Sequence, residues 1–146
     1  MKWLVDTNVV SELIRKTPDE KTVAWLGSVP LSDLYISDVS LAEIRFGIET
    51  SSNPVRRAQI RQWLEDVVRP MFDSRTLPVT EQVLFVWRGL ASTAQSKGKT
   101  IAQADSLIAA TAAAASFRIC TRDVAPFLIC GLPVFNPFTG ERFNGA

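Results

Sequence analysis

The chain has 146 residues, with 16 lysines and arginines, 15 aspartates and glutamates, and no histidine. A length in the range of about 100–200 residues predicts one domain, here residues 1–146 with a core over 2–138 and a short tail over 139–146. The net charge of +1 favours no class of partner, and the absence of histidine excludes Ser-His-Asp and Cys-His nucleophiles and the common histidine-containing zinc sites. Any catalytic chemistry must therefore use carboxylates, lysines, hydroxyls or a metal ion.

The cysteines and the apolar stretches indicate a cellular compartment. Cys120 and Cys130 do not form a CxxC pair, and Cys120 lies in the apolar run FRIC, which is typical of a reduced cytosolic protein. One lysine and four apolar residues precede Asp6, fewer than a signal peptide needs, and the longest apolar stretch, residues 107–115, is about half a membrane span. We therefore expect a cytoplasmic protein that does not enter a membrane.

Predicted strands and helices alternate along the chain. In chain order the residue pattern predicts a strand over 3–5, helices over 8–15 and 19–29, a strand over 34–37, helices over 40–51 and 54–68, a strand over 76–79, helices over 80–98 and 102–116, and strands over 118–121 and 132–135. Asp19 and Thr80 are good N-cap residues, and Gly98 is a good helix end. The alternation predicts an α/β fold with a mostly parallel central sheet covered by helices on both faces.

Acidic residues follow three of the predicted strands. Asp6 comes directly after the first strand, Asp38 directly after the second, and Asp123 one arginine after the fourth. Because the carboxyl ends of parallel strands meet at one edge of the sheet, where ligands bind in such folds, we expect these side chains to project there. Glu43 lies in the helix that begins after Asp38, and Asp105 lies in the first turn of the alanine-rich helix.

Each acid also has a purely structural interpretation. Taken alone, Asp6 or Asp38 is best explained as an N-cap, worth about 1 kcal/mol. Asp105 falls on an otherwise apolar helix face, where an ionised acid costs more than the helix dipole offsets unless the acid is paired. Glu43 lies away from the apolar stripe of its helix, as a solvated acid would, although the small residue Gly47 one turn on leaves room for a substrate.

Carboxylates gathered at one edge of the sheet would repel one another and raise one another's pKa values. A divalent cation removes that penalty. Oxygen ligands without histidine or a thiolate pair favour a hard cation, Mg²⁺ or Mn²⁺. Because Mg²⁺ keeps water ligands and recruits phosphate oxygens, such a site indicates phosphoryl transfer or phosphodiester hydrolysis.

Five sequence motifs occur in an order typical of one protein family. They are LVDTNVVSELI, SLAEIRFGI, IAQADSLIAATA, ICTRDVAPF and VFNPF, and together they extend from about Lys2 to Phe138. This series resembles the PIN-domain ribonucleases, in particular the FitB-type branch of the VapC-like toxins of bacterial type II toxin–antitoxin systems. The resemblance implies a PIN-like three-layer α/β/α sandwich with a mostly parallel central sheet.

The resemblance also implies a set of site residues. The family's catalytic quartet, which binds Mg²⁺ or Mn²⁺, corresponds to Asp6, Glu43, Asp105 and Asp123. In this set Glu43 would act through water or orient the nucleophile, and the three aspartates would hold the metal. Asn8 and Thr121 match polar residues that could steady ligands or water. Asp38 matches no member of the quartet, so its interpretation stays that of an N-cap.

The implied activity is that of a metal-dependent endoribonuclease, the toxin of a toxin–antitoxin pair. Its implied partners are RNA, a small antitoxin with a DNA-binding part and a tail that wraps this domain, and a second copy of the toxin. Arg15 and Lys16 are candidates for guiding RNA. Arg56, Arg57 and Arg61 are more typical of a solvated helix face.

Two other functional interpretations stay open. An aspartyl-phosphate phosphatase also begins with an aspartate after the first strand, but it needs a second aspartate as general acid where Asn8 stands. A non-catalytic PIN-like module that acts through a partner complex would be marked by lost quartet acids, and all four are present. Trp63 and Trp87 lie at the spacing of core residues in their helices, so we expect both in the core rather than at an interface.

Overall fold

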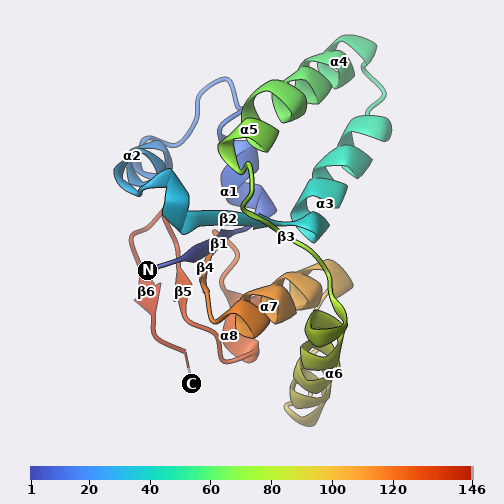
Figure 1. Cartoon of the computed structure of the whole chain (residues 1–146), viewed down its shortest axis with the longest axis vertical. Helices are drawn as coiled ribbons and strands as arrows, with labels where there is room; N and C mark the ends of the chain where they lie inside the picture. The colour runs from blue at the N-terminus through green and yellow to red at the C-terminus, as the bar shows by residue number, and fades with distance from the viewer. Residues whose placement is uncertain (146) are drawn as a thin grey trace.

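A mostly parallel sheet forms the centre of the computed structural model, which describes residues 1–145 (Figure 1). The strands of this sheet lie in the order β3-β2-β1-β4-β5-β6. Their bounds are β1 Trp3–Val5, β2 Leu34–Ser37, β3 Thr76–Leu77, β4 Arg118–Cys120, β5 Val134–Phe135 and β6 Arg142–Phe143. Strands β1 to β5 run parallel, and β6 pairs antiparallel with β5.

Helices cover both faces of this sheet (Figure 1). On one face lie α1 Thr7–Glu12, α2 Glu20–Ser28, α3 Asp38–Glu49, α4 Pro54–Trp63 and the short α5 Arg69–Met71. On the other face lie α6 Glu81–Ser96, α7 Gln103–Ala115 and α8 Ala125–Ile129. The predicted caps of two helices are confirmed, since the Asp19 side chain caps α2 and the Thr80 side chain caps α6.

Alternate residues of each central strand contact opposite helical layers. In β1, Trp3 and Val5 belong to the core on the α1–α4 side, whereas Leu4 belongs to the core on the α7 and α8 side. In β4, Cys120 and Ile119 divide between the two cores in the same way. Because side chains alternate along a strand, a sheet covered on both faces needs apolar residues at every position. The predicted α/β/α sandwich is confirmed.

Residues 54–68 are helical, as the sequence predicts, but the winding of the helix changes within this range. Helix α4 ends at Trp63, a π-helix forms over Leu64–Val68, and α5 begins at Arg69. The cause is Pro70, which has no N–H to donate to the carbonyl four residues earlier and whose ring clashes with that carbonyl. The wider π turns before Pro70 let the chain continue helically past this defect.

Two short elements and one tryptophan also differ from the sequence analysis. Helix α8 and strand β6 are not predicted, because so few residues show no hydrophobic period. Trp63 is buried in the core as expected, but Trp87 is only half-buried and lines a cavity between α6 and α7. The core prediction for Trp87 is therefore wrong, because the indole lines this cavity and is not enclosed by packing on all sides.

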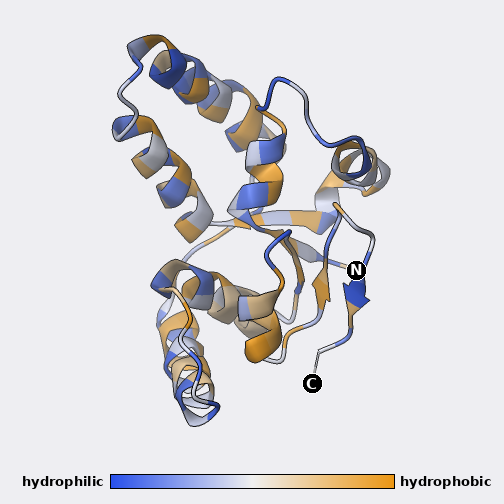
Figure 2. Ribbon diagram, turned by 180° about the vertical axis from the view of Figure 1, so that it is seen from behind, coloured by the Kyte–Doolittle hydropathy of each residue, from blue (hydrophilic) through white to orange (hydrophobic). Residues whose placement is uncertain are grey.

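Hydropathy differs between the sheet and the outer helices (Figure 2). Strand β5 and helix α8 are largely hydrophobic and β6 is hydrophilic, whereas α3 and α4 mix hydrophobic and hydrophilic residues along their lengths. None of the helices formed by residues 1–145 combines the length and the apolarity needed to cross a membrane.

Candidate active site

Four carboxylates lie at the carboxyl edge of the sheet. Asp6 directly follows β1, and Asp123 lies in the loop after β4. Glu43 lies on α3, which begins where β2 ends, and Asp105 lies in the first turn of α7. Because β2, β1 and β4 are neighbours in the sheet, three of these acids come from the ends of adjacent strands or from the helix that follows one.

Asp6 is enclosed by the protein, with only 4% of its surface exposed. It is the N-cap of α1, and its Oδ1 accepts a hydrogen bond from the Thr7 N–H at 2.7 Å. Its Oδ2 accepts one from the Thr121 hydroxyl at 2.8 Å and a longer one from the Asn8 amide at 3.4 Å. The N-cap interpretation of Asp6 is confirmed, and the same bonds hold its carboxylate in one orientation.

The Thr121 hydroxyl connects Asp6 to the loop that carries Asp123. It donates to Asp6 and accepts from the Asp123 N–H and from the Asn8 amide, both at 3.1 Å. The side-chain oxygen of Asn8, Oδ1, accepts a hydrogen bond from the Arg122 backbone N–H at 3.1 Å. A hydroxyl offers one donor and two acceptor positions, so Thr121 uses all three. The start of α1 and the loop after β4 are therefore joined at two points.

Glu43 is exposed and contacts the site from α3. Its Oε1 accepts a hydrogen bond from the Thr7 hydroxyl at 2.9 Å, which joins α3 to the first residue of α1. The stripe formed by Leu41, Ile44 and Ile48 is buried, as the sequence predicts, and α3 presents Glu43 outside that stripe. The hydrogen bond from Thr7 engages one of the two carboxylate oxygens.

Burial and mutual repulsion raise the pKa of two of the acids. Burial raises the pKa of Asp6 from 3.8 to about 6, and the charges of Asp105 and Glu43 add to this rise. The hydrogen bonds from its two threonine partners act in the opposite direction. Burial also raises the pKa of Asp105, with further contributions from Asp123 and Glu43. Each of the four carboxylates therefore interacts electrostatically with at least one other.

The chemistry of this donor set fits a hard divalent cation. All four groups are carboxylates, and a cation offsets both their burial and their repulsion. Among residues 1–145, no three Asp, Glu or Cys side chains lie close enough together to ligate one ion jointly. Mg²⁺ commonly binds through one or two carboxylates and keeps its other ligands as water. The arrangement therefore suits direct binding by one or two acids, with the others acting through water.

The candidate RNA-guiding cations lie in different settings. Arg15 is exposed, and its guanidinium is paired at 3.2 Å with the buried Glu12. Lys16 beside it is exposed. On α4, Arg57 donates to a backbone carbonyl and Arg61 to a glutamate of α3, so both guanidinium groups contact the protein itself. The sequence likewise makes this helix a weaker candidate for RNA contact than Arg15 and Lys16.

Asp38 is not an N-cap, which corrects the sequence interpretation. Ser37 caps α3 instead, and its hydroxyl oxygen accepts a hydrogen bond from the Ser40 N–H at 3.1 Å. Asp38 is the first residue of the helix and is exposed. There its charge lies near the positive end of the helix dipole. Asp38 therefore stabilises the start of α3 and is not part of the acid site.

Three residues that hold the site or its neighbouring segments in place were not predicted from the sequence. Thr7 binds Glu43, and the buried Asn136 donates to the Arg122 carbonyl at 3.4 Å, within the loop that leads to Asp123. The buried Glu12 accepts from Arg15 and from a backbone N–H after α1. Thr7 and Asn136 belong to the DTN and VFNPF motifs, so membership of a motif was a usable signal. For Glu12 the signal was an acid among the apolar residues of a short helix.

Comparisons with known proteins identify the family of this chain. The PIN domain family model matches residues 3–127. Toxin FitB of Neisseria gonorrhoeae is 41% identical over 135 residues, which cover 92% of this chain and 97% of that protein. VapC ribonuclease Y4jK of Sinorhizobium fredii is 38% identical over 135 residues, with 92% and 96% covered.

A solved structure gives the same result. The structure of FitAB bound to an IR36 DNA fragment superposes with a TM-score of 0.87 at 40% identity, and covers 93% of this chain and 95% of that one. The family model and the relatives thus match most of the chain, and the fold agrees along the same length. The chain belongs to the PIN-domain family.

Proposed function

We propose that this chain is a metal-dependent endoribonuclease and the toxin of a toxin–antitoxin pair. The observation that carries the proposal is the set of interacting carboxylates at the carboxyl edge of the sheet, Asp6, Glu43, Asp105 and Asp123. The relatives support it, because one is named a toxin and another a ribonuclease. A phosphatase that uses an aspartyl-phosphate is disfavoured, because the Asn8 amide is engaged with Thr121 and cannot act as a general acid.

Mg²⁺ or Mn²⁺ is the proposed cofactor. Asp6, Asp105 and Asp123 would hold it, directly or through water, and Glu43 would face the same ion through water. When bound, such an ion lowers the pKa of a water molecule and neutralises charge that develops on a phosphate. The oxygen-only donor set and the raised pKa of Asp6 support this choice.

The protein's own groups position the reactants. Thr121 and Asn8 keep the Asp6 carboxylate in one orientation, and Thr7 holds one oxygen of Glu43. The second oxygen of Glu43 accepts the proton of the water that attacks the phosphodiester in line. The bond from phosphorus to the 3′ oxygen breaks, that oxygen takes a proton from solvent, and the products are a 3′-hydroxyl and a 5′-phosphate.

We further propose that the chain acts in the cytoplasm as one domain and a homodimer, bound to a small antitoxin with a DNA-binding part. The solved FitAB complex is bound to a DNA fragment, which supports a partner of this kind. A cavity of about 270 Å³ adjoins Glu43 between α1, α3 and α4, and its walls include Ile44, Ile60 and Trp63. Such a cavity suits an apolar side chain from the antitoxin's tail.

Replacing Asp6 with asparagine tests the proposed activity. We expect Asp6→Asn to lower the rate of RNA cleavage by about 10³-fold or more, because a lost metal ligand removes several kcal/mol of charge stabilisation and each 1.4 kcal/mol is about tenfold in rate. Asp38→Asn is the matched control, since Asp38 is an exposed acid at the same sheet edge that only begins α3. Equal cleavage by wild type and Asp6→Asn, both free of contaminating nuclease, would contradict the proposal.

Thermal unfolding gives a reading of metal binding that does not depend on activity. Adding Mg²⁺ at about 100 times its dissociation constant should stabilise the wild type by about 2.7 kcal/mol at neutral pH. The Asp38→Asn protein should respond equally and the Asp6→Asn protein much less. An identical response in all three proteins would place the ion elsewhere.

A further inference from the structure

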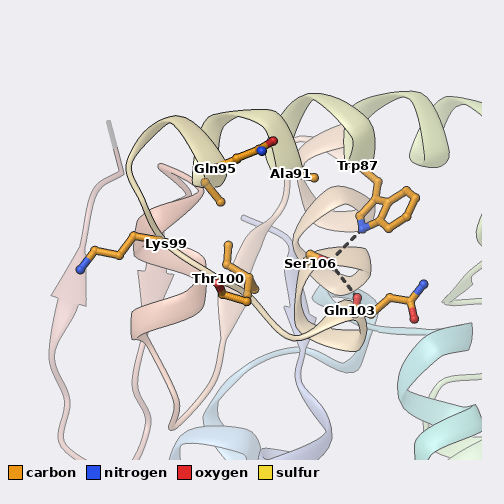
Figure 3. A pocket seen from close by; sticks show the side chains of 9 residues that line it. Trp87, Ala91, Gln95, Lys99, Thr100, Gln103 and Ser106 are labelled. Carbon is orange, nitrogen blue, oxygen red and sulfur yellow. Dashed lines mark hydrogen bonds between the residues drawn. The ribbon is translucent and has the colours of Figure 1, made fainter.

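A cavity of about 440 Å³ lies between α6 and the start of α7 (Figure 3). Trp87, Ala91 and Ala94 of α6 form one wall. The loop that joins the two helices forms the opposite wall with Thr100 and Ile101. The volume falls within the range of about 300–1,000 Å³ that is usual for small-molecule sites. We propose that this cavity binds one nucleotide of the RNA beside the cleaved phosphate, a proposal that rests on the proposed ribonuclease function.

The Trp87 indole is held in place, and its only polar atom is engaged. Its Nε1 donates to the Ser106 hydroxyl at 2.8 Å, and that hydroxyl donates to the Gln103 carbonyl at 2.8 Å (Figure 3). The half-buried ring therefore offers its π-face rather than its N–H to a ligand. A fixed aromatic face next to open space is what a nucleobase stacks on, and such stacking is tolerant of base identity.

Polar side chains also line this cavity. Gln95 and Gln103 are exposed, and each amide offers both donors and an acceptor, which suits the edge of a base. Lys99 is exposed at the end of the cavity opposite Trp87 and suits a phosphate (Figure 3). No acidic side chain of residues 1–145 lines it. The positive charge of Lys99, with no acid from these residues beside it in the cavity, favours RNA over a protein partner.

The cavity lies close enough to the carboxylates to hold a neighbouring nucleotide. Gln103 and Ser106 line it, and Asp105 lies between them in the first turn of α7. Residues two positions apart lie on nearly opposite sides of a helix, so Asp105 and Gln103 face away from each other across a width of about 10–12 Å. The bound base therefore belongs to a nucleotide one or two positions from the scissile phosphate.

RNA affinity tests this subsite without requiring cleavage. A fluorescently labelled short single-stranded RNA of mixed sequence is titrated with the full-length Asp6→Asn protein and with the same protein carrying a second change. Loss of one stacked base weakens binding by about five- to 150-fold, so we expect Trp87→Ala to fall in that range and Trp87→Phe to keep most of the affinity. Lys99→Ala should bind more weakly, with a reduced dependence on salt.

Matched control variants lie on other helices. Gln59→Ala on α4 and Lys21→Ala on α2 replace exposed residues of the same types outside the cavity, and both should leave affinity unchanged. If Trp87→Ala does not fold, Gln103→Ala carries the test, since Gln103 is exposed and its backbone carbonyl, not its side chain, binds Ser106. RNA affinity that is equal for the Trp87, Lys99 and Gln103 variants and the controls would overturn the proposal.

Cleavage products separate this proposal from the function on which it rests. In the active background, Gln103→Ala should relax base preference at one position near the cut, by about five- to 150-fold for one bidentate contact, while Gln59→Ala should not. If cleavage depends on Asp6 but Gln103→Ala changes neither the cleavage profile nor the RNA affinity, the nucleotide site is overturned and the ribonuclease function stands. If Trp87→Ala instead alters oligomeric state and leaves RNA affinity intact, the cavity is a protein interface and the proposal fails. No Asp6-dependent cleavage in any protein would overturn the ribonuclease function itself.

Discussion

The acid site has a buried half, formed by Asp6 with Thr121 and Asn8, and an outer half, formed by the exposed acids Glu43 and Asp123. Hydrogen bonds reach both oxygens of the Asp6 carboxylate. In the outer half, by contrast, the Glu43 carboxylate accepts from Thr7 at one oxygen. Both halves belong to one electrostatic cluster, yet the protein restrains them to very different degrees.

The site thereby combines one fixed carboxylate with others that can adjust. Orienting a ligand group before substrate arrives requires packing and hydrogen bonds around it, and the packing raises the energy of the charged form by excluding water. Asp6 shows both effects, with fixed geometry and a pKa raised to about 6 by burial. The outer acids keep their solvent and can adjust to an ion and an RNA. We therefore expect changes in the buried half to be the more damaging.

Lengthening one acid in each half should give the largest contrast. Asp6→Glu adds a methylene group at a site that is 4% exposed and displaces the carboxylate from its partners. A shift of about 1 Å can cost about 10²-fold in rate, so we expect a loss of at least that size. Asp123→Glu should stay within about tenfold of wild type, because the exposed loop leaves room for it. Single-turnover cleavage rates measure both, and equal losses would remove the distinction between the halves.

The pH dependence of stability should come from the buried half. The pKa of Asp6 is about 6 in the folded protein against an ordinary 3.8. Between these values the folded protein keeps a proton that the unfolded chain releases, so the free energy of unfolding falls as pH rises. At about 1.4 kcal/mol per pKa unit, this loss is absent below 3.8 and reaches about 3 kcal/mol above pH 6.

Urea unfolding of the metal-free wild type and of Asp6→Asn measures this effect. The difference in unfolding free energy should shift in favour of Asp6→Asn as pH rises from about 4 to about 6. Asp19 acts oppositely, because its hydrogen bonds with Thr22 lower the pKa of its carboxyl, but it is present in both proteins and cancels. A difference that does not change with pH would show that burial of Asp6 costs nothing.

Removing one hydroxyl from each half should give the smallest contrast. Thr121→Val removes one hydrogen bond each from Asp6, Asn8 and the Asp123 N–H, so we expect a loss of about 1–3 kcal/mol in unfolding free energy. Thr7→Val removes one exposed hydrogen bond to Glu43 and should cost about 0.5–1.5 kcal/mol. Both substitutions keep the side-chain shape, and denaturant unfolding compares them directly. A larger loss of unfolding free energy for Thr7→Val than for Thr121→Val would contradict the view that the buried half is the more strongly restrained.

The positions of the acids were largely predictable from local sequence. Asp6 and Asp123 follow apolar strands, and a parallel sheet brings such positions to one edge. Asp105 was recognisable because it lies on an otherwise apolar helix face. Glu43 had only a surface-acid pattern, and the resemblance to the PIN-domain ribonucleases selected it. The cap at Asp38 was wrong, because a serine one residue earlier competes equally well for that role.

The connections between the acids were not predictable in this way. The bonds from Thr121 to Asp6 and from Thr7 to Glu43 join residues 115 and 36 positions apart in the chain. The cavity beside Trp87 likewise arises from how α6 meets α7, and the sequence pattern placed that tryptophan in the core. Contacts of this kind depend on angles and distances between elements, which hydrophobic periodicity does not contain.

The α/β alternation, the two-sided sheet and the absence of histidine chemistry follow from the sequence alone, because strand and helix periods and residue types are local properties. Which acid is buried, which hydroxyls orient it and where a neighbouring cavity lies depend on how the segments pack in three dimensions. Burial sets the pKa of Asp6, and burial depends on every segment that packs around the end of β1. The residues of the site are thus written along the chain, while their protonation and orientation follow from packing.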